Sequence, residues 1–118
     1  MKETVLVVDD SKPIRRSIRR ILEQASLQVV EAPGGYEALE AIRQAEFNLV
    51  LLDVNMPSSL SGPETFEQLR KDFPNLPVLF VTGDGHRLSG ILGQPRVGLV
   101  EKPFDKQDLL AAVKGLLL

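Results

Sequence analysis

Cysteine is absent from the 118 residues of this chain. A chain without cysteine has no disulfide framework, no thiolate zinc site and no cysteine nucleophile. An excess of positive charge is also absent, since 14 Lys and Arg residues stand against 16 Asp and Glu residues and the net charge is −2. Because phosphate neutralisation supplies most of the affinity of nucleic-acid-binding proteins, we expect no direct nucleic-acid partner.

Long hydrophobic runs are missing as well. Apolar runs such as residues 49–52 are far shorter than the roughly 20 residues that span a bilayer. The first residues lead directly into a strand-like segment, without the apolar core of a signal peptide. We therefore expect a cytoplasmic protein with no membrane partner. The length and the ordinary balance of 43% hydrophobic and 25% charged residues predict one folded domain over residues 1–118.

Five short apolar segments predict strands at residues 4–8, 28–32, 48–52, 76–81 and 97–101. The first, third and fourth consist almost entirely of Val, Leu, Ile or Phe, as is typical of strands buried on both faces of a parallel sheet. The second and fifth are less uniformly apolar and suit sheet edges. Alternation of these strands with helical segments predicts an α/β fold with an open, doubly wound parallel sheet.

Helical spacing of apolar residues predicts the connecting helices. They are expected after the capping residue Ser11, through Tyr36, Leu39, Ile42 and Phe47, over residues 63–72 and over residues 106–117. Tyr36 and the five Phe residues are interpreted as packing residues rather than a base-stacking surface. Residues 84–96 include three Gly and one Pro, which predicts at most a short, frayed helix and high mobility there.

Polar side chains follow four of the predicted strands, at the point where each strand ends. Asp9 and Asp10 follow the first, Asp53 the third, Thr82 the fourth and Lys102 the fifth. Because the carboxyl ends of parallel strands meet at one edge of the sheet, we expect these groups to converge. Three crowded carboxylates repel one another unless a cation offsets them, and their oxygen ligands suit Mg²⁺. These parts favour phosphoryl transfer, with Asp53 as nucleophile and Asp9 and Asp10 as metal ligands.

Four motifs occur in order along the chain. They are Val5-Leu6-Val7-Val8-Asp9-Asp10, Leu51-Leu52-Asp53 with Met56-Pro57 and Gly62, Thr82-Gly83, and Lys102-Pro103-Phe104. Together they resemble the receiver domain of two-component response regulators, over the whole chain. The resemblance implies a single receiver domain at residues 1–118, with a five-stranded flavodoxin-like sheet of order 2-1-3-4-5 and helices on both faces.

The resemblance also implies the chemistry of the site. Asp53 would accept a phosphoryl group from a histidine kinase or a histidine phosphotransfer protein. Asp10, Asp53 and the backbone carbonyl of Asn55 would ligate Mg²⁺, with Asp9 acting mainly through water. The chain would then be a signalling protein, not an enzyme beyond its own phosphotransfer and autodephosphorylation.

The remaining site residues would couple this chemistry to an output. Lys102, followed by a cis peptide bond to Pro103, would pair with the acyl phosphate. Thr82 would move toward the phosphoryl oxygen, and the surface of the fourth and fifth strands would be read by a downstream effector domain or protein.

Three positions depart from the family pattern. Leu99 occupies the place of the usual aromatic switch residue, so aromatic coupling would be absent or altered, or Leu99 is simply a core residue. Residues 58–62 form a loop that is one residue longer than usual, which leaves the start of the following helix uncertain. Gly83 replaces the commoner Ala and loosens the loop beside the site.

The arginines of the first helix and the single histidine are open to more than one interpretation. Arg15, Arg16, Arg19 and Arg20 share the polar side of the helix, as a solvated face or as a docking surface for an acidic patch on the phosphodonor protein. His86 has no second histidine with which to share a metal, and we expect no catalytic role for it.

Three other functions fit parts of the same pattern. An aspartyl phosphatase or phosphotransferase would need an acid two residues after Asp53, where the chain has Asn55. A flavin or nucleotide binder would need a Gly/Ser/Thr-rich loop after the first strand, where Asp9 and Asp10 stand instead. A module that keeps the fold without phosphate signalling is compatible with Leu99, although the complete set of acids, Thr and Lys argues against it.

Overall fold

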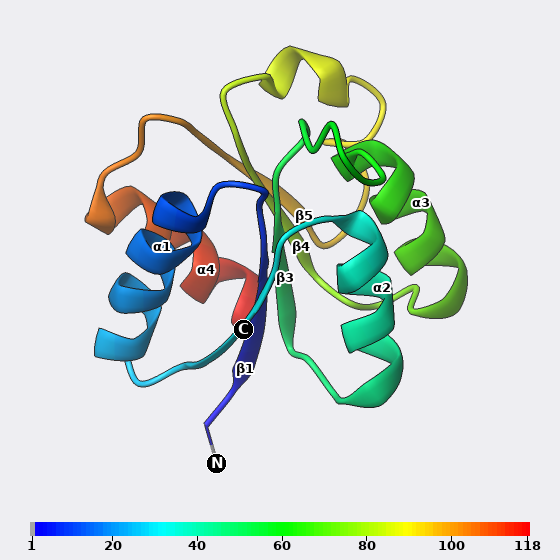
Figure 1. Cartoon of the computed structure of the whole chain (residues 1–118). Helices are drawn as coiled ribbons and strands as arrows, with labels where there is room; N and C mark the ends of the chain where they lie inside the picture. Colours follow the sequence, from blue (N-terminus) through cyan, green and yellow to red (C-terminus); the bar gives the residue numbers. More distant parts are fainter. Residues whose placement is uncertain (1) are drawn as a thin grey trace.

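Five parallel strands form the centre of the structure, a computed structural model that describes residues 2–118 (Figure 1). They are β1 (Thr4–Val8), β2 (Gln28–Ala32), β3 (Leu49–Leu52), β4 (Val78–Thr82) and β5 (Val97–Glu101). Their order in the sheet is β2-β1-β3-β4-β5, which confirms the predicted topology. The order reverses between β1 and β3, so the carboxyl ends of these two strands form the edge at which α/β proteins of this type bind ligands.

Four α-helices cover the two faces of the sheet in pairs (Figure 1). They are α1 (Lys12–Gln24) and α4 (Lys106–Leu117) on one face, and α2 (Gly35–Gln44) and α3 (Gly62–Asp72) on the other. Each face has its own apolar cluster, and the central strands contribute alternate side chains to both. The strand β3 is completely buried, as the unbroken run Leu49–Leu52 predicted.

Caps fix the helix starts beside the carboxyl edge. The Ser11 hydroxyl accepts a hydrogen bond from the Ile14 N–H at 3.4 Å and begins α1. Ser61 and Glu64 form a reciprocal capping box at the start of α3, which resolves the helix start that the longer loop left uncertain. The hydrogen bonds from Ser61 lower the pKa of Glu64.

Some sequence-based expectations were wrong at the ends of elements. Phe47 lies beyond α2, which ends at Gln44, and it packs from the following loop. Tyr36 is 63% exposed and is therefore not a packing residue, and Phe73 is also exposed. The strand β4 begins at Val78 rather than at residue 76. Pro77 has no N–H to donate, although its carbonyl accepts a hydrogen bond from the Val50 N–H at 3.0 Å.

Residues 84–96 contain one short 3₁₀ helix, η1 (Gly85–Leu88), followed by turns. This agrees with the short helix predicted there. Leu88 is fully buried and anchors the segment to the core, while most of the residues around it are exposed. The high mobility of this segment stays a prediction. Within residues 2–118, the helices are all too short or too polar to cross a membrane.

Candidate functional site

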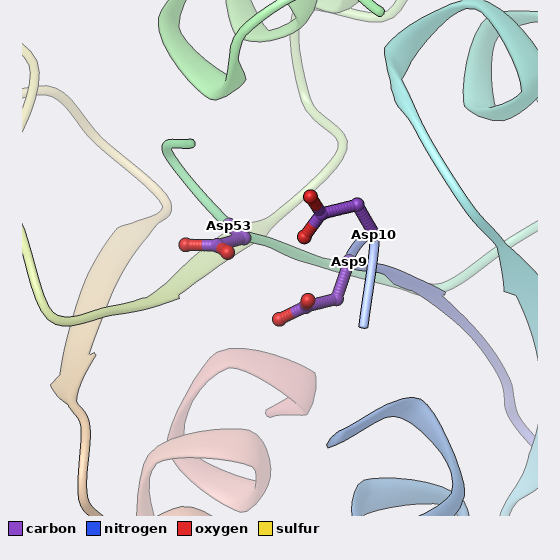
Figure 2. Close-up of side chains that lie close together, drawn as sticks. All are labelled: Asp9, Asp10 and Asp53. Carbon is purple, nitrogen blue, oxygen red and sulfur yellow. The ribbon is translucent and has the colours of Figure 1, made fainter. Parts of the chain in front are cut away.

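Three carboxylates gather at the adjacent ends of β1 and β3 (Figure 2). Asp9, Asp10 and Asp53 each offer one oxygen, and these oxygens lie within 4.8 Å of one another. The sheet register causes this arrangement, because Val8 pairs with Leu52 and the Asp53 N–H donates to the Val8 carbonyl at 3.0 Å. Asp9 and Asp53 are buried and Asp10 is exposed.

Lys102 enters this cluster from the end of β5. Its Nζ donates to Asp9 Oδ2 at 2.8 Å and to Asp53 Oδ2 at 3.2 Å. Burial by itself lowers the pKa of Lys102, but the hydrogen bonds and charges of Asp9 and Asp53 outweigh burial and leave the pKa raised. The Lys102 N–H donates to the Thr82 carbonyl at 2.9 Å, and the Lys102–Pro103 peptide bond is cis. We call Asp9, Asp53 and Lys102 the acid–lysine cluster.

The three carboxylates differ in the number of hydrogen bonds that they accept. Asp9 Oδ1 accepts from the Ser11 N–H at 2.9 Å, and Asp53 Oδ1 accepts from the Val54 N–H at 2.7 Å. Within residues 2–118, no side chain or backbone group donates a hydrogen bond to the Asp10 carboxylate. Three carboxylates facing one ammonium leave uncompensated negative charge, and all the donors are oxygens, so this set fits a hard divalent cation.

A second set of polar side chains links the loop after β3 with the segment after β4. The Asn55 amide donates to the Asp84 carboxylate, and Asn55 Oδ1 accepts from Arg87. The Asp84 N–H in turn donates to the hydroxyl of the buried Thr82 at 3.1 Å. We call Asn55, Asp84 and Arg87 the loop network. Sequence reasoning missed Asp84 and Arg87, because no motif or spacing predicts which residues of the segments after β3 and β4 will meet.

Two glycines and one leucine near the site have contrasting surroundings. A Cβ added to Gly62 would lie 2.2 Å from the Asp53 carbonyl oxygen, so only glycine allows α3 to start this close to Asp53. At Gly83 an added Cβ would meet nothing within 4 Å. Leu99 packs partly buried against the core and beside Gly85, which supports its interpretation as a core residue.

The arginine face of α1 divides into two pairs. Arg15 and Arg19 both form ion pairs with Glu31 on β2, at 3.1 Å and 2.6 Å. Arg16 and Arg20 are exposed, and Arg19 keeps 39% of its side chain exposed, so a docking partner could reach these three arginines more easily than Arg15. His86 has an exposed side chain 3.9 Å from Asp84 and lies outside the acid–lysine cluster.

Comparison with known proteins places the chain in a family. Residues 5–114 match the response regulator receiver domain family. The response regulator MprA of Mycobacterium sp. (strain KMS) is 38% identical over 120 residues, which cover 99% of this chain and 51% of that protein. The chain spans about half the length of the curated relatives of this kind that it matches.

Solved structures agree with this assignment. The chemotaxis protein CheY4 of Vibrio cholerae is 30% identical, with a TM-score of 0.90 and coverage of 99% of this chain and 100% of that one. The response regulator TrrA of Thermotoga maritima, crystallised in complex with Mg²⁺-BeF, is 30% identical, with a TM-score of 0.89 and coverage of 98% and 99%. With the ordered motifs and the sheet topology, these matches show that the chain belongs to the response regulator receiver domain family.

Proposed function

We propose that this receiver domain, spanning residues 1–118, is a Mg²⁺-dependent phosphoacceptor with Asp53 as the site of modification. The observation that carries the proposal is the acid–lysine cluster. Lys102 lies between two buried carboxylates, while the Asp10 carboxylate beside them accepts no hydrogen bond from residues 2–118. The Mg²⁺-BeF complex of the similar TrrA structure supports the choice of metal.

The proposed reaction transfers a phosphoryl group between two protein side chains. An oxygen of Asp53 attacks phosphorus and forms a P–O bond, the P–N bond to a donor histidine breaks, and the imidazole keeps the electron pair. Mg²⁺, held by Asp10, Asp53 and the backbone carbonyl of Asn55, with Asp9 acting mainly through water, would neutralise phosphoryl oxygens when bound. Lys102 pairs with the acyl phosphate, and its hydrogen bond to Asp53 Oδ2 at 3.2 Å supports this role.

The partners follow from the same proposal. The donor is a histidine kinase or a histidine phosphotransfer protein in the cytoplasm, and the reader is a downstream effector domain or protein. Thr82 reports the modification, because its hydroxyl can donate to a phosphoryl oxygen while it accepts the Asp84 N–H, and it so connects the site to the segment that carries Asp84. Reading takes place on the surface around β4 and β5. The domain transfers and loses its own phosphoryl group and turns over no other substrate.

Intact-mass measurement after incubation with acetyl phosphate tests the proposal. We expect one phosphoryl adduct on the wild-type protein with Mg²⁺, none without Mg²⁺, and none on Asp53→Asn. Asp72→Asn, a change at an exposed residue at the end of α3, is the matched control and should be modified like the wild type. Absence of an adduct on the folded wild type, together with failure to bind beryllofluoride, would favour a module that does not signal through phosphate.

A further inference from the structure

Glu31, Arg15 and Arg19 form a group of ion pairs next to the turn that carries Asp9 and Asp10. Glu31, at 20% side-chain exposure, accepts from Arg15 Nε at 3.1 Å and from Arg19 Nη1 at 2.6 Å. Burial by itself raises the pKa of Glu31, but the hydrogen bonds from Arg19 and Arg15 outweigh burial and leave the pKa lowered. Glu31 is therefore ionised at neutral pH and holds the Arg15 guanidinium in one orientation.

Arg15 also contacts the backbone of the candidate metal site. Its Nη1 donates to the Asp9 carbonyl oxygen at 2.7 Å, and the Arg15 side chain is only 13% exposed. That carbonyl belongs to the peptide group that joins Asp9 to Asp10, so the bond fixes the plane of this peptide. The guanidinium thus connects β2, through Glu31, to the acidic turn after β1.

Asp10 depends on its backbone more than the other two acids do. Asp9 and Asp53 each have two hydrogen-bond partners on their carboxylates, whereas no group within residues 2–118 donates to the Asp10 carboxylate. With no hydrogen bond from residues 2–118, the Asp10 carboxylate depends for its direction on the backbone from which the side chain projects.

We propose that Arg15 is a positioning residue for cation binding: by holding the Asp9–Asp10 peptide, it directs the Asp10 carboxylate toward Asp53. This inference rests on the proposed function, because it concerns the same Mg²⁺ site. Glu31 has a double role, since it orients the guanidinium and its negative charge offsets the positive charge that Arg15 brings near the site.

Charge and orientation make opposite predictions for removal of Arg15. A guanidinium near a divalent cation repels it, so a purely electrostatic effect would make the Arg15→Met protein bind Mg²⁺ more tightly. Loss of a hydrogen bond that orients a metal ligand weakens metal binding, typically by about tenfold or more. The sign of the change therefore separates the two effects.

The test is a Mg²⁺ titration followed in ¹H–¹⁵N spectra through the amides of residues 9–10 and 53–55. Four proteins are compared: wild type, Arg15→Met, Arg15→Lys and Arg16→Met. Arg16 is the matched control, since it is an exposed arginine on the same helix and its loss removes the same charge. The dispersion of the same spectra reports whether each variant is folded.

We expect about tenfold weaker Mg²⁺ binding for Arg15→Met. Arg15→Lys should recover part of the affinity, because its single donor nitrogen keeps the positive charge but cannot bond Glu31 and the Asp9 carbonyl as the guanidinium does. Arg16→Met should show no weakening. Unchanged or tighter binding in folded Arg15→Met, or equal weakening in Arg16→Met, would overturn the inference while leaving the proposed function intact. A wild-type protein that does not bind Mg²⁺ would overturn both.

Discussion

The acid–lysine cluster and the loop network differ in how their side chains are held. The side chains of Asp9, Asp53 and Lys102 are 3%, 9% and 23% exposed, and they stand at the ends of strands in one rigid sheet. Asn55 and Arg87 are exposed, and they stand in the loop after β3 and in the short helix η1. The charges that perform the proposed chemistry are therefore fixed, whereas the loops that would respond to it are held by a few solvent-exposed bonds.

The two glycines beside the site show the same contrast between tightly packed and open surroundings. Gly62 is pressed against the backbone of Asp53, and Gly83 lies in open space. We therefore expect changes at Gly62 and in the acid–lysine cluster to alter global stability or cation binding, and changes in the loop network to alter mainly local opening.

The largest effect is expected from Gly62→Ala. The new Cβ would lie 2.2 Å from the Asp53 carbonyl oxygen and 2.9 Å from Val54 Cα, and backbone cannot move aside as a flexible side chain can. We expect a loss of about 2–3 kcal/mol in the free energy of unfolding, measured by urea denaturation.

Gly83→Ala is the matched substitution in the loop. Nothing lies within 4 Å of its added Cβ, so we expect no loss and a gain of up to about 1 kcal/mol from the lower entropy of the unfolded chain. Equal destabilisation by Gly62→Ala and Gly83→Ala would contradict the claim that the backbone around Asp53 is tightly packed and the loop after β4 is not.

Asp10→Asn is expected to stabilise the metal-free protein. It removes one of three mutually repelling carboxylates whose oxygens lie within 4.8 Å. At this separation in a largely aqueous setting the repulsion is about 1 kcal/mol. Thermal denaturation should give a higher midpoint for Asp10→Asn than for wild type without Mg²⁺, and added Mg²⁺ should raise the midpoint of the wild type alone. A lower midpoint for the metal-free variant would show that the Asp10 carboxylate is stabilised by the fold.

A smaller, pH-dependent effect is expected from Glu31→Gln. Because the pKa of Glu31 lies below its ordinary value of 4.5, the ionised carboxylate stabilises the fold at higher pH, and this contribution is lost as the pH falls through the lowered pKa. Solvent screening of these partly exposed ion pairs limits the contribution to about 0.5–1 kcal/mol. Urea denaturation at pH 7 should show the loss, and the gap to wild type should close in acid. Glu46→Gln, at an exposed loop residue, should show no gap at either pH.

The smallest effect on global stability is expected from Asn55→Ala. Its bonds to Asp84 and Arg87 are exposed, so the free energy of unfolding should change by less than about 0.5 kcal/mol. Amide hydrogen exchange in residues 84–88 should nevertheless become faster, because the loop network no longer holds η1. Asn75→Ala, at an exposed residue before β4, is the control and should leave exchange there unchanged.

Sequence reasoning was most successful where strands impose the geometry. The order of the sheet and the meeting of Asp9, Asp10 and Asp53 at one edge follow from parallel strands and their shared carboxyl ends. The bonds of Arg15 to Glu31 and to the Asp9 carbonyl were not predicted. A polar helix face looks the same in sequence whether its side chains are solvated or folded back onto the sheet.

Aromatic and loop residues were the hardest to place. Tyr36 fits an apolar helical stripe, but it stands in the first turn of α2, beyond the edge of the core, and is exposed. The loop network depends on how the segments after β3 and β4 fold toward each other. Local propensity carries no information about that approach.

The most direct test of this account compares ¹H–¹⁵N spectra of the Mg²⁺-loaded wild-type protein before and after addition of beryllofluoride, a mimic of an aspartyl phosphate. The account predicts shifts at residues 9–10, 53–55 and 102 and at residues 82–88, with little change along α2 and no change at all in Asp53→Asn. A spectrum that does not respond, or a response that persists in Asp53→Asn, would contradict the claim that Asp53 is the phosphoacceptor of a metal site coupled to this loop.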